Sequence, residues 1–249
     1  MDRALFIAGT GARELMRRQD VQTNNLANAQ TPGFRAEMAA QRTAPVVGGP
    51  GLRTRAYAVE STPSADFSQG SLMATGRPLD VAIQGNGWFS VQAPDGAEAY
   101  TRGGSFNLTA DGALVDNSGR PVLDTMGQMI ALPPDTEIVI NDNGSVSTVS
   151  TVNGQRVESL LQTTLKLVNP EPQALERGGD GLFRLKAGGP APIDDTVRVS
   201  AGFVESSNVN PIETMVNMIA ASRHYDMQVQ LMQNIDQNGQ AATKILSYS

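Results

Sequence analysis

The side chains that could support catalysis are few in this sequence. His224 is the only histidine, and no second histidine follows four residues later to complete a helical metal-binding pair. Cysteine is absent, which excludes thiolate catalysis, disulfide bonds and cysteine-based metal sites. Gly85-Asn86-Gly87 begins like a dinucleotide-binding loop, but Ser90 stands where that loop needs its third glycine. We therefore predict no catalytic residue, no bound metal and no cofactor.

Carboxylates are the remaining candidates for chemistry, because a pair of them can hydrolyse a glycosidic bond. Most of the aspartates, however, lie in glycine-flanked turn contexts, which explain aspartate without catalysis. A glycan hydrolase that uses Asp80 and Asp111 stays open as an alternative, and an assay of glycan release with each aspartate replaced would decide it. The aspartates considered are Asp80, Asp111, Asp116, Asp124, Asp194 and Asp195.

The charge of the chain does not suit a nucleic-acid partner. The net charge is −6, and the nearest approach to a basic cluster, Arg13, Arg17 and Arg18, contains Glu14 and Asp20. A phosphate-binding surface needs clustered lysine and arginine side chains. We therefore predict neither nucleic acid nor a small-molecule substrate as a ligand. The length of 249 residues allows one large domain or two modest ones.

The N-terminus does not have the form of a cleavable signal peptide. The apolar stretch at residues 5–8 is followed by Arg13 before an apolar region of about 7–15 residues can develop. Nowhere does the sequence approach the roughly 20 apolar residues of a membrane-spanning helix. If the protein leaves the cytoplasm, we expect it to do so without a cleavable signal.

The elements that must position any functional residues begin with a long N-terminal helix. Residues 3–28 contain no proline, and their apolar or small residues recur at spacings of three and four. Thr31-Pro32-Gly33 then ends the helix, because the residue before a proline disfavours helical backbone and glycine accepts left-handed backbone. The residues on the apolar face are Leu5, Ala8, Ala12, Leu15 and Leu26.

A second and longer helix is predicted at the C-terminus. Asn210-Pro211 supplies an N-cap residue followed by proline at the first helical position. Residues 212–246 contain no further proline, and Gly239 is their one interruption. Apolar and small side chains here follow the alternating three-four spacing that is typical of a coiled coil. The residues on this repeat are Met215, Met218, Ser222, Tyr225, Val229, Met232, Gly239, Ala242 and Leu246.

The middle of the chain is predicted to be an all-β domain. Asp-Gly and Asn-Gly dipeptides recur at short intervals, and strand-forming runs separate them. The runs are residues 88–91, 137–140 and 165–168, and the dipeptides are Asp95-Gly96, Asp111-Gly112, Asn143-Gly144 and Asn153-Gly154.

The predicted fold class is α+β, with long N- and C-terminal helices that form a coiled-coil-like α domain and a central all-β domain inserted between them. Residues 1–35 and 205–249 would form the helical domain and residues 76–185 the β domain, while residues 36–75 and 186–204 would be extended connections. An isolated amphipathic helix is marginal in water, so each helix must pack against the other or against neighbouring copies. This layout is typical of a self-assembling subunit.

Motifs at both ends and in the middle of the chain resemble signatures of the flagellar basal-body rod family, which includes rod, hook and hook-associated proteins. The resemblance covers nearly the whole chain in order. The N-terminal motif is Asn24-Asn25-Leu26-Ala27-Asn28 with Thr31-Pro32-Gly33-Phe34-Arg35, and the C-terminal motif lies at residues 205–210 and 218–227. The middle segments are Arg77-Pro78-Leu79-Asp80-Val81-Ala82-Ile83, Gly85-Asn86-Gly87-Trp88-Phe89 and Tyr100-Thr101-Arg102-Gly103-Gly104-Ser105-Phe106.

The resemblance implies a structural subunit, not an enzyme, that is exported by the flagellar type III apparatus and polymerises into a tubular drive shaft across the periplasm. It implies that the partners are other rod subunits and copies of the same chain, and that the terminal helices line the inner tube. Within the family, the length, Trp88 and the run at residues 177–183 favour a proximal-rod member, with a distal-rod member as the alternative. Asp226 and Gln230 depart from the glutamate and lysine that the family more often has there.

The expected assembly interface comprises both helices and the segments next to them. Buried asparagine amides both donate and accept hydrogen bonds and would fix the register between subunits, although asparagine is also an ordinary residue at a helix end. The methionines are either plain core residues or an adaptable seam. The predicted interface residues are Leu5, Leu15, Asn24, Asn25, Leu26, Asn28, Thr31, Pro32, Gly33, Phe34, Glu205, Ser206, Asn208, Val209, Asn210, Met215, Met218, Ile219, Tyr225 and Met232.

Overall fold

The chain divides into two compact units, which are described separately. The computed structural model describes residues 2–38, 41–45, 56–60, 64–132, 137–152 and 155–247. Unit 1 contains residues 1–29, 36–66 and 209–249, and unit 2 contains residues 30–35 and 67–208. The three-part division expected from the sequence has other boundaries and stays a prediction. The expected turn at Asn153-Gly154 lies outside the described residues.

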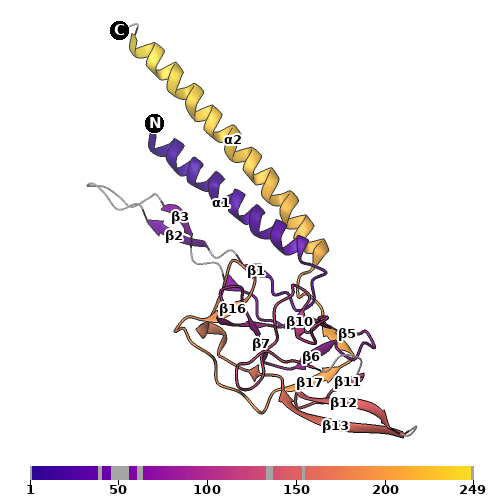
Figure 1. Ribbon diagram of the computed structural model, residues 1–249. Helices are drawn as coiled ribbons and strands as arrows, with labels where there is room; N and C mark the ends of the chain where they lie inside the picture. The colour runs from indigo at the N-terminus through magenta and orange to yellow at the C-terminus, as the bar shows by residue number, and fades with distance from the viewer. Residues whose placement is uncertain are drawn as a thin grey trace. The chain divides into compact units, whose positions relative to one another are not determined.

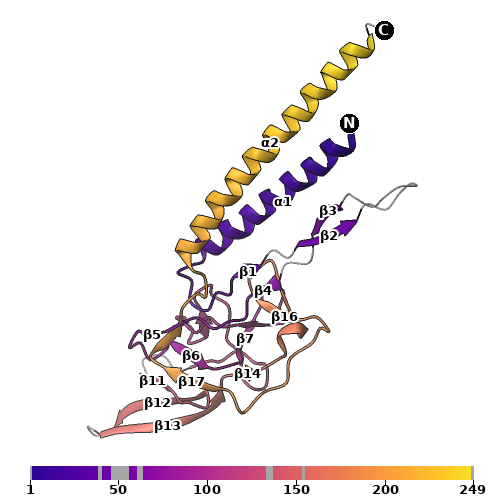
Figure 2. The same cartoon turned by 180° about the vertical axis from the view of Figure 1, so that it is seen from behind.

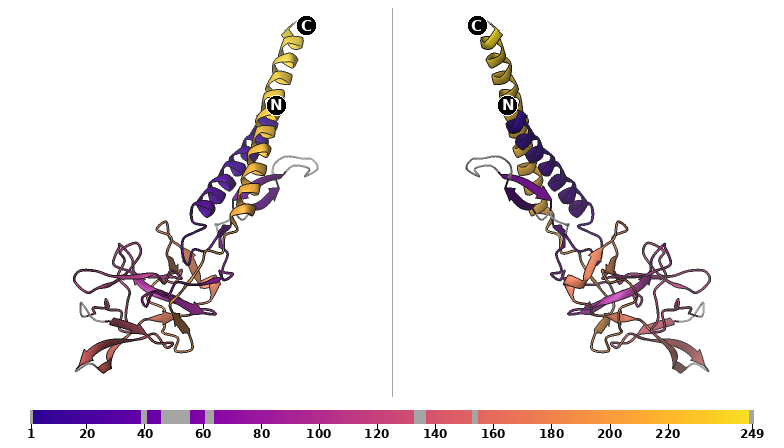
Figure 3. Two further views of the ribbon diagram at one scale, coloured as in Figure 1. Left: turned by 90° about the vertical axis from the view of Figure 1, so that its right-hand side faces the viewer. Right: turned by 90° about the vertical axis from the view of Figure 1, so that its left-hand side faces the viewer.

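Unit 1 is built on two long helices, α1 (Asp2–Ala27) and α2 (Pro211–Ser247). They run antiparallel and contact each other, side by side in Figure 1 and Figure 2 and overlapping in the views of Figure 3. Two short antiparallel strand pairs accompany the helices, and β3 contacts α1. These pairs are β1 (Glu37–Met38) with β4 (Ser64–Ala65) and β2 (Gln41–Pro45) with β3 (Ala56–Glu60).

The start of α2 confirms the predicted cap. The Oδ1 atom of Asn210 accepts hydrogen bonds from the backbone N–H groups of Ile212 at 3.1 Å and Glu213 at 3.3 Å. Pro211 occupies the first helical position, where its missing N–H has no helical partner to lose. At the other junction α1 ends at Ala27, and the Asn28 N–H closes the last turn on the Asn24 carbonyl at 3.1 Å.

The predicted coiled-coil-like domain is wrong. Leu5 and Met215, which the prediction placed in an apolar seam, are 43% and 50% exposed. A coiled coil packs large apolar side chains between its helices. Here the buried helical positions are small or polar, and they include Ala8, Ala12, Thr214 and Ala221.

Glycine on α1 explains part of this difference. A Cβ atom added at Gly11 would lie 3.7 Å from the Gln228 side chain of α2. A glycine therefore meets a glutamine where a coiled coil would pair two apolar residues. The coarser description is two terminal helices that flank a mainly β region.

Unit 2 is a set of antiparallel sheets. Its five-stranded sheet has the order β14-β7-β8-β16-β15, and its three-stranded sheet has the order β11-β12-β13. The five strands are β14 (Leu167–Val168), β7 (Trp88–Gln92), β8 (Glu98–Thr101), β16 (Phe183–Leu185) and β15 (Leu175–Arg177). The three strands are β11 (Glu137–Ile140), β12 (Ser145–Val152) and β13 (Gln155–Thr164). A short 3-10 helix, η1 (Pro172–Ala174), precedes β15.

Three two-stranded pairs complete unit 2, and two of them join segments that lie far apart in the sequence. β6 (Val81–Gln84) pairs with β17 (Arg198–Ala201), and β5 (Leu72–Ala74) pairs with β18 (Phe203–Glu205). The third pair, β9 (Phe106–Leu108) with β10 (Leu114–Asp116), is a local hairpin. The fold of unit 2 is therefore complete only when β5 and β6 have paired with β18 and β17.

The predicted Asp-Gly and Asn-Gly turns at three positions are confirmed. Gly96, Gly112 and Gly144 each have a φ of +81°, a left-handed backbone that glycine adopts without a Cβ penalty. Each glycine N–H donates to the carbonyl three residues earlier. These turns set the positions of the strands around them.

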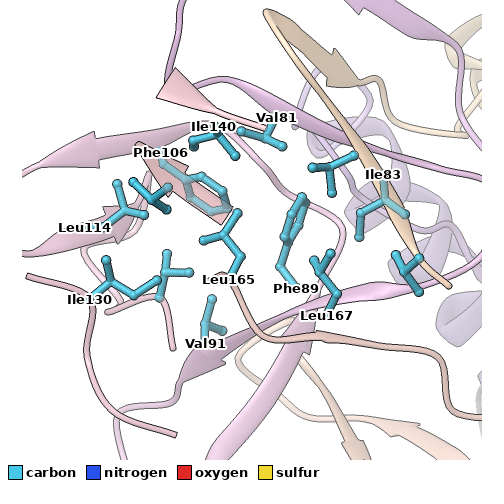
Figure 4. Packing of buried hydrophobic residues seen from close by; sticks show 14 of the residues in the cluster. Val81, Ile83, Phe89, Val91, Phe106, Leu114, Ile130, Ile140, Leu165 and Leu167 are labelled. Carbon is cyan, nitrogen blue, oxygen red and sulfur yellow. The ribbon is translucent and has the colours of Figure 1, made fainter. Parts of the chain in front are cut away.

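The core of unit 2 is aliphatic with two phenylalanines at its centre. Phe89 and Phe106 are fully buried and meet edge to face, with ring centroids 5.2 Å apart. Figure 4 shows Leu165, Leu167 and Ile140 from other strands and loops around these rings. Edge-to-face pairs contribute about 0.5–1.5 kcal/mol beyond the area that they bury.

Candidate functional site

The predicted interface residues fall into both units. Thr31, Pro32, Gly33, Phe34, Glu205, Ser206 and Asn208 belong to unit 2, and the other predicted residues belong to unit 1. Leu5, Asn24, Thr31, Asn210, Met215 and Ile219 are exposed, and Asn25, Gly33, Phe34, Glu205 and Val209 are buried. The half-exposed residues are Leu15, Leu26, Asn28, Pro32, Ser206, Asn208, Met218, Tyr225 and Met232.

An exposed apolar surface follows α2. Ile212, Met215, Val216 and Ile219 are each at least half exposed and lie three or four residues apart, on neighbouring turns of the helix. The surface continues at Met227 and Leu231, and α1 presents Leu5, Phe6 and Met16. We call these nine residues the exposed helix surface. Neighbouring exposed apolar residues, such as the first four on α2, are typical of interaction sites.

Asn25 uses its amide inside unit 1. Its Nδ2 donates to the Glu37 carbonyl at 2.8 Å, and its Oδ1 accepts from the Glu37 N–H at 2.8 Å. The side chain thus forms both hydrogen bonds of a strand-like pair with the backbone of β1. Asn28 donates from Nδ2 to the Asn24 carbonyl at 2.9 Å, which satisfies a carbonyl at the end of α1. A register role between subunits stays a prediction.

Three of the quoted motifs meet at one carboxylate in unit 2. Glu205 is 1% exposed, and its Oε1 lies 2.8 Å from Arg35 Nη1 in an ion pair and accepts a hydrogen bond from the Gly70 N–H at 2.9 Å. Its Oε2 accepts a hydrogen bond from Arg102 Nε at 2.7 Å and lies 2.6 Å from Arg102 Nη2 in an ion pair. We call Arg35, Arg102 and Glu205 the buried ion cluster. Charge-assisted hydrogen bonds of this kind are roughly twice as strong as neutral ones.

Arg102 also connects the cluster to the Gly85-Asn86-Gly87 motif. Its Nη1 donates to the Gly87 carbonyl at 2.7 Å, and its Nη2 donates to the Gly85 carbonyl at 2.9 Å. This motif is therefore an acceptor for a guanidinium group, whereas a phosphate loop presents N–H donors. Burial lowers the pKa of Arg102, and the Arg35 charge acts in the same direction, while Glu205 opposes both.

Gly33 permits the close approach of the N-terminal motif to β8. Its φ is +70°, and a Cβ atom there would lie 2.2 Å from the backbone carbon of Arg102. The Gly33 N–H donates to the Glu205 carbonyl at 2.8 Å. The Thr-Pro-Gly sequence follows the end of α1 at Ala27 and brings the following backbone against the buried ion cluster.

Arg177 also contacts the N-terminal motif. Its guanidinium lies 4.5 Å from the centre of the Phe34 ring, a cation–π distance, and its Nη1 donates to the Arg35 carbonyl at 3.0 Å. The Asn208 N–H donates to the Phe34 carbonyl at 3.3 Å. Residues 31–35 are therefore held by the C-terminal motif and by the run at residues 177–183.

Sequence reasoning missed Arg35, Arg102 and Arg177 as site residues. Arg35 and Arg102 lie inside the motifs that resemble the family signatures, and membership of these motifs is the one sequence feature that could have identified them. No local pattern indicates that arginines 67 residues apart would share one glutamate, because that pairing is set by the closure of β5 on β18.

The aspartates of the hydrolase alternative form turns and hydrogen bonds. Asp116 Oδ1 accepts from the Ser118 and Arg120 N–H groups, and Asp124 Oδ1 accepts from the Met126 and Gln128 N–H groups. Asp80 Oδ1 accepts from the Ser105 hydroxyl at 2.8 Å. The positions of these carboxylates are explained by backbone geometry.

The single histidine and the possible metal ligands were also located in the described residues. His224 is exposed on α2. Within the ranges that the structure describes, no group of three or more histidine, cysteine, aspartate or glutamate side chains is placed to hold a metal ion. Within the same ranges, neither helix is long and apolar enough to cross a membrane.

Comparison with known proteins identifies the family. Residues 5–35 match the family described as flagella basal body rod protein. Residues 82–148 match the flagellar hook protein FlgE/F/G D1 domain, and residues 200–245 match the flagellar basal body rod FlgEFG protein C-terminal family.

Full-length relatives agree with these matches. The chain is 40% identical over 255 residues to the flagellar basal-body rod protein FlgF of Salmonella typhimurium, and 40% identical over 256 residues to that of Escherichia coli, with both chains fully covered in each case. It is 34% identical to the flagellar basal-body rod protein FlgG of Buchnera aphidicola, with 94% of this chain and 96% of the relative covered. The chain belongs to the flagellar basal-body rod protein family, most like FlgF, and is a structural subunit of the rod in the flagellar basal body.

Proposed function

We propose that this chain joins the proximal part of the rod through its two terminal helices, which pack against the helices of neighbouring subunits. The observation that carries the proposal is the exposed helix surface. Burial of a large apolar side chain contributes about 1.5–3 kcal/mol relative to leaving it in water. Burial of the exposed helix surface against a neighbouring subunit would therefore contribute strongly to the free energy of association.

The antiparallel helix pair explains why the surface remains available. The most deeply buried apolar residues of its two helices are small, and they are Ala8, Ala12 and Ala221. Several large apolar side chains, among them Ile212 and Ile219, stay exposed. Each subunit therefore meets its neighbours with residues that its own fold does not use.

The proposed assembly is head to tail. A contact between different surfaces of identical or related subunits, repeated without closing, produces a helical filament. The partners we propose are copies of this chain and the neighbouring axial subunits. Export by the flagellar type III apparatus without a cleavable signal, and a periplasmic location for the assembled rod, are further parts of the proposal.

Replacing Met215 and Ile219 by aspartate is expected to abolish incorporation into the rod. A charge on the exposed helix surface must be desolvated in any helix–helix interface, which opposes association. The double variant would be expressed in a strain that lacks the wild-type gene, and purified basal bodies would be probed for the chain. We expect at least a tenfold loss from the basal-body fraction, which corresponds to about 1.4 kcal/mol of association energy.

The matched control replaces Met126 by aspartate. Met126 is 79% exposed in a turn of unit 2, so it tests the same chemical change away from the helices. This variant should enter basal bodies at the wild-type level. Normal incorporation of the Met215→Asp/Ile219→Asp variant, with the chain folded in solution, would refute the helical interface.

Deleting residues 1–30 should leave unit 2 folded but exclude the chain from the rod. The deletion removes α1 and retains Thr31 to Arg35, which supply the contacts to Glu205. Near-ultraviolet circular dichroism of the purified variant reports the packing around Trp88, and basal-body fractionation reports assembly. Rod assembly by this deletion variant would contradict the requirement for the helix.

A further inference from the structure

The buried ion cluster joins three stretches of unit 2 that are widely separated in the sequence. Arg35 comes from the N-terminal motif, Arg102 follows β8, and Glu205 ends β18. The three side chains are between 1% and 3% exposed. Backbone hydrogen bonds reinforce the same meeting point, because Gly33 donates to the Glu205 carbonyl and Ser206 donates to the Ser71 carbonyl at 2.8 Å each.

The cluster has one negative and two positive charges. A charge buried without its partner is far more costly than a buried apolar group, and removing one member of a buried ion pair strongly destabilises a protein. If residues 204–208 leave their place, the two guanidinium groups remain beside each other without the Glu205 carboxylate. The free energy of a partly opened form of unit 2 is therefore raised by more than the loss of its apolar contacts alone.

We propose that the buried ion cluster is a lock that makes unit 2 open and close as one cooperative body. Unit 2 reaches its closed form only when residues 31–35 and residues 204–208 are both in place. While the second segment is missing, the two arginines oppose closure, because they would have to be buried together without an anion. Glu205 therefore acts as the last component of the fold.

The lock has a consequence for how the helices are attached. Residues 31–35 follow α1 closely in the chain, and residues 204–208 lead into α2. Coupling the two segments means that a chain lacking either one does not present a closed unit 2. This inference concerns folding alone and does not depend on the proposed rod interface.

Hydrogen exchange of the full-length protein tests the lock through three reporter amides. The Gly33 and Ser206 amides report the two terminal segments, and the Leu123 amide, which donates to the Ser90 carbonyl at 3.0 Å, reports the core. In the wild-type protein we expect the three to open together, with protection factors within about threefold of one another. The test variant replaces Arg35, Arg102 and Glu205 by methionine, which removes the charges and keeps side chains of similar length.

In the triple methionine variant, Gly33 and Ser206 are expected to become at least about tenfold less protected than Leu123, because opening a segment no longer strands a charge. Protection that stays equal at the three amides would overturn the proposal. The Glu205→Gln variant provides a second test that does not rely on the triple variant folding. Its three amides should lose protection by the same factor, about a hundredfold or more, and retained protection at Leu123 alone would also overturn the lock.

Discussion

Replacing Glu205 by glutamine is expected to lower the free energy of unfolding of unit 2 by about 3–5 kcal/mol. Glutamine keeps the size of the side chain but leaves Arg35 and Arg102 buried together without a negative charge. Urea unfolding can be followed by the fluorescence of Trp88, the only tryptophan, which is 6% exposed in unit 2. A shift of the midpoint at constant slope identifies the change as one of stability.

The control for this experiment is Glu171→Gln. Glu171 is exposed and its side chain makes no cap hydrogen bond to η1, so its replacement should change stability by less than about 0.5 kcal/mol. The Glu205 effect should also persist in high salt, because buried ion pairs are screened much less than exposed ones. A loss below about 1 kcal/mol would show that the cluster behaves like an exposed ion pair.

Local signals in the sequence predicted the start of α2 and three of the turns. Asn210-Pro211 fixes the start of α2 because the first N–H groups of a helix have no helical acceptor. The Asn210 amide oxygen accepts hydrogen bonds from two of them, and Pro211 has no N–H to satisfy. The Asp-Gly and Asn-Gly turns are likewise set by backbone conformations that few residues other than glycine adopt. Such features depend on a few adjacent residues, so a single sequence is enough to find them.

The coiled-coil prediction failed because a periodic apolar stripe does not say what covers it. Met215 and Ile219 lie at helical spacing, and that spacing is the same for a face buried inside one chain and a face exposed for a partner. Gly11 of α1 instead lies beside Gln228 of α2, and Ala221 is a buried position on α2. Both residues carry little hydrophobic signal. The apolar spacing alone therefore does not distinguish the residues between α1 and α2 from the residues of the exposed helix surface.

The buried ion cluster lay beyond sequence reasoning for a different reason. Glu205 was singled out as an interface residue from its motif, but its partners are 103 and 170 positions away in the sequence. Only the pairing of β5 with β18 and the backbone turn at Gly33 bring these residues together. Motif resemblance singled out Glu205, while its two arginine partners are identified only by the tertiary fold.

Replacing Gly33 by alanine is the second change expected to have a large effect, about 2–5 kcal/mol of lost stability in unit 2. Left-handed backbone costs a residue with a Cβ atom about 1–2 kcal/mol, and overpacking adds about 1–3 kcal/mol. At Gly33 both apply, because φ is +70° and the new Cβ would lie 2.2 Å from the nitrogen of Gly103. Urea unfolding monitored at Trp88 measures the loss.

Gly76→Ala separates the two contributions. Gly76 has nearly the same φ, +71°, but a Cβ there meets no atom within 4 Å, so only the backbone term of about 1–2 kcal/mol should appear. The difference between the variants then measures the contact of Gly33 with the backbone of Arg102. Because Gly33 also donates its N–H to the Glu205 carbonyl, any shift that relieves the clash must move the N-terminal motif away from β18. Equal losses in the two variants would mean that the N-terminal motif moves aside without cost, and that the buried ion cluster does not hold it in place.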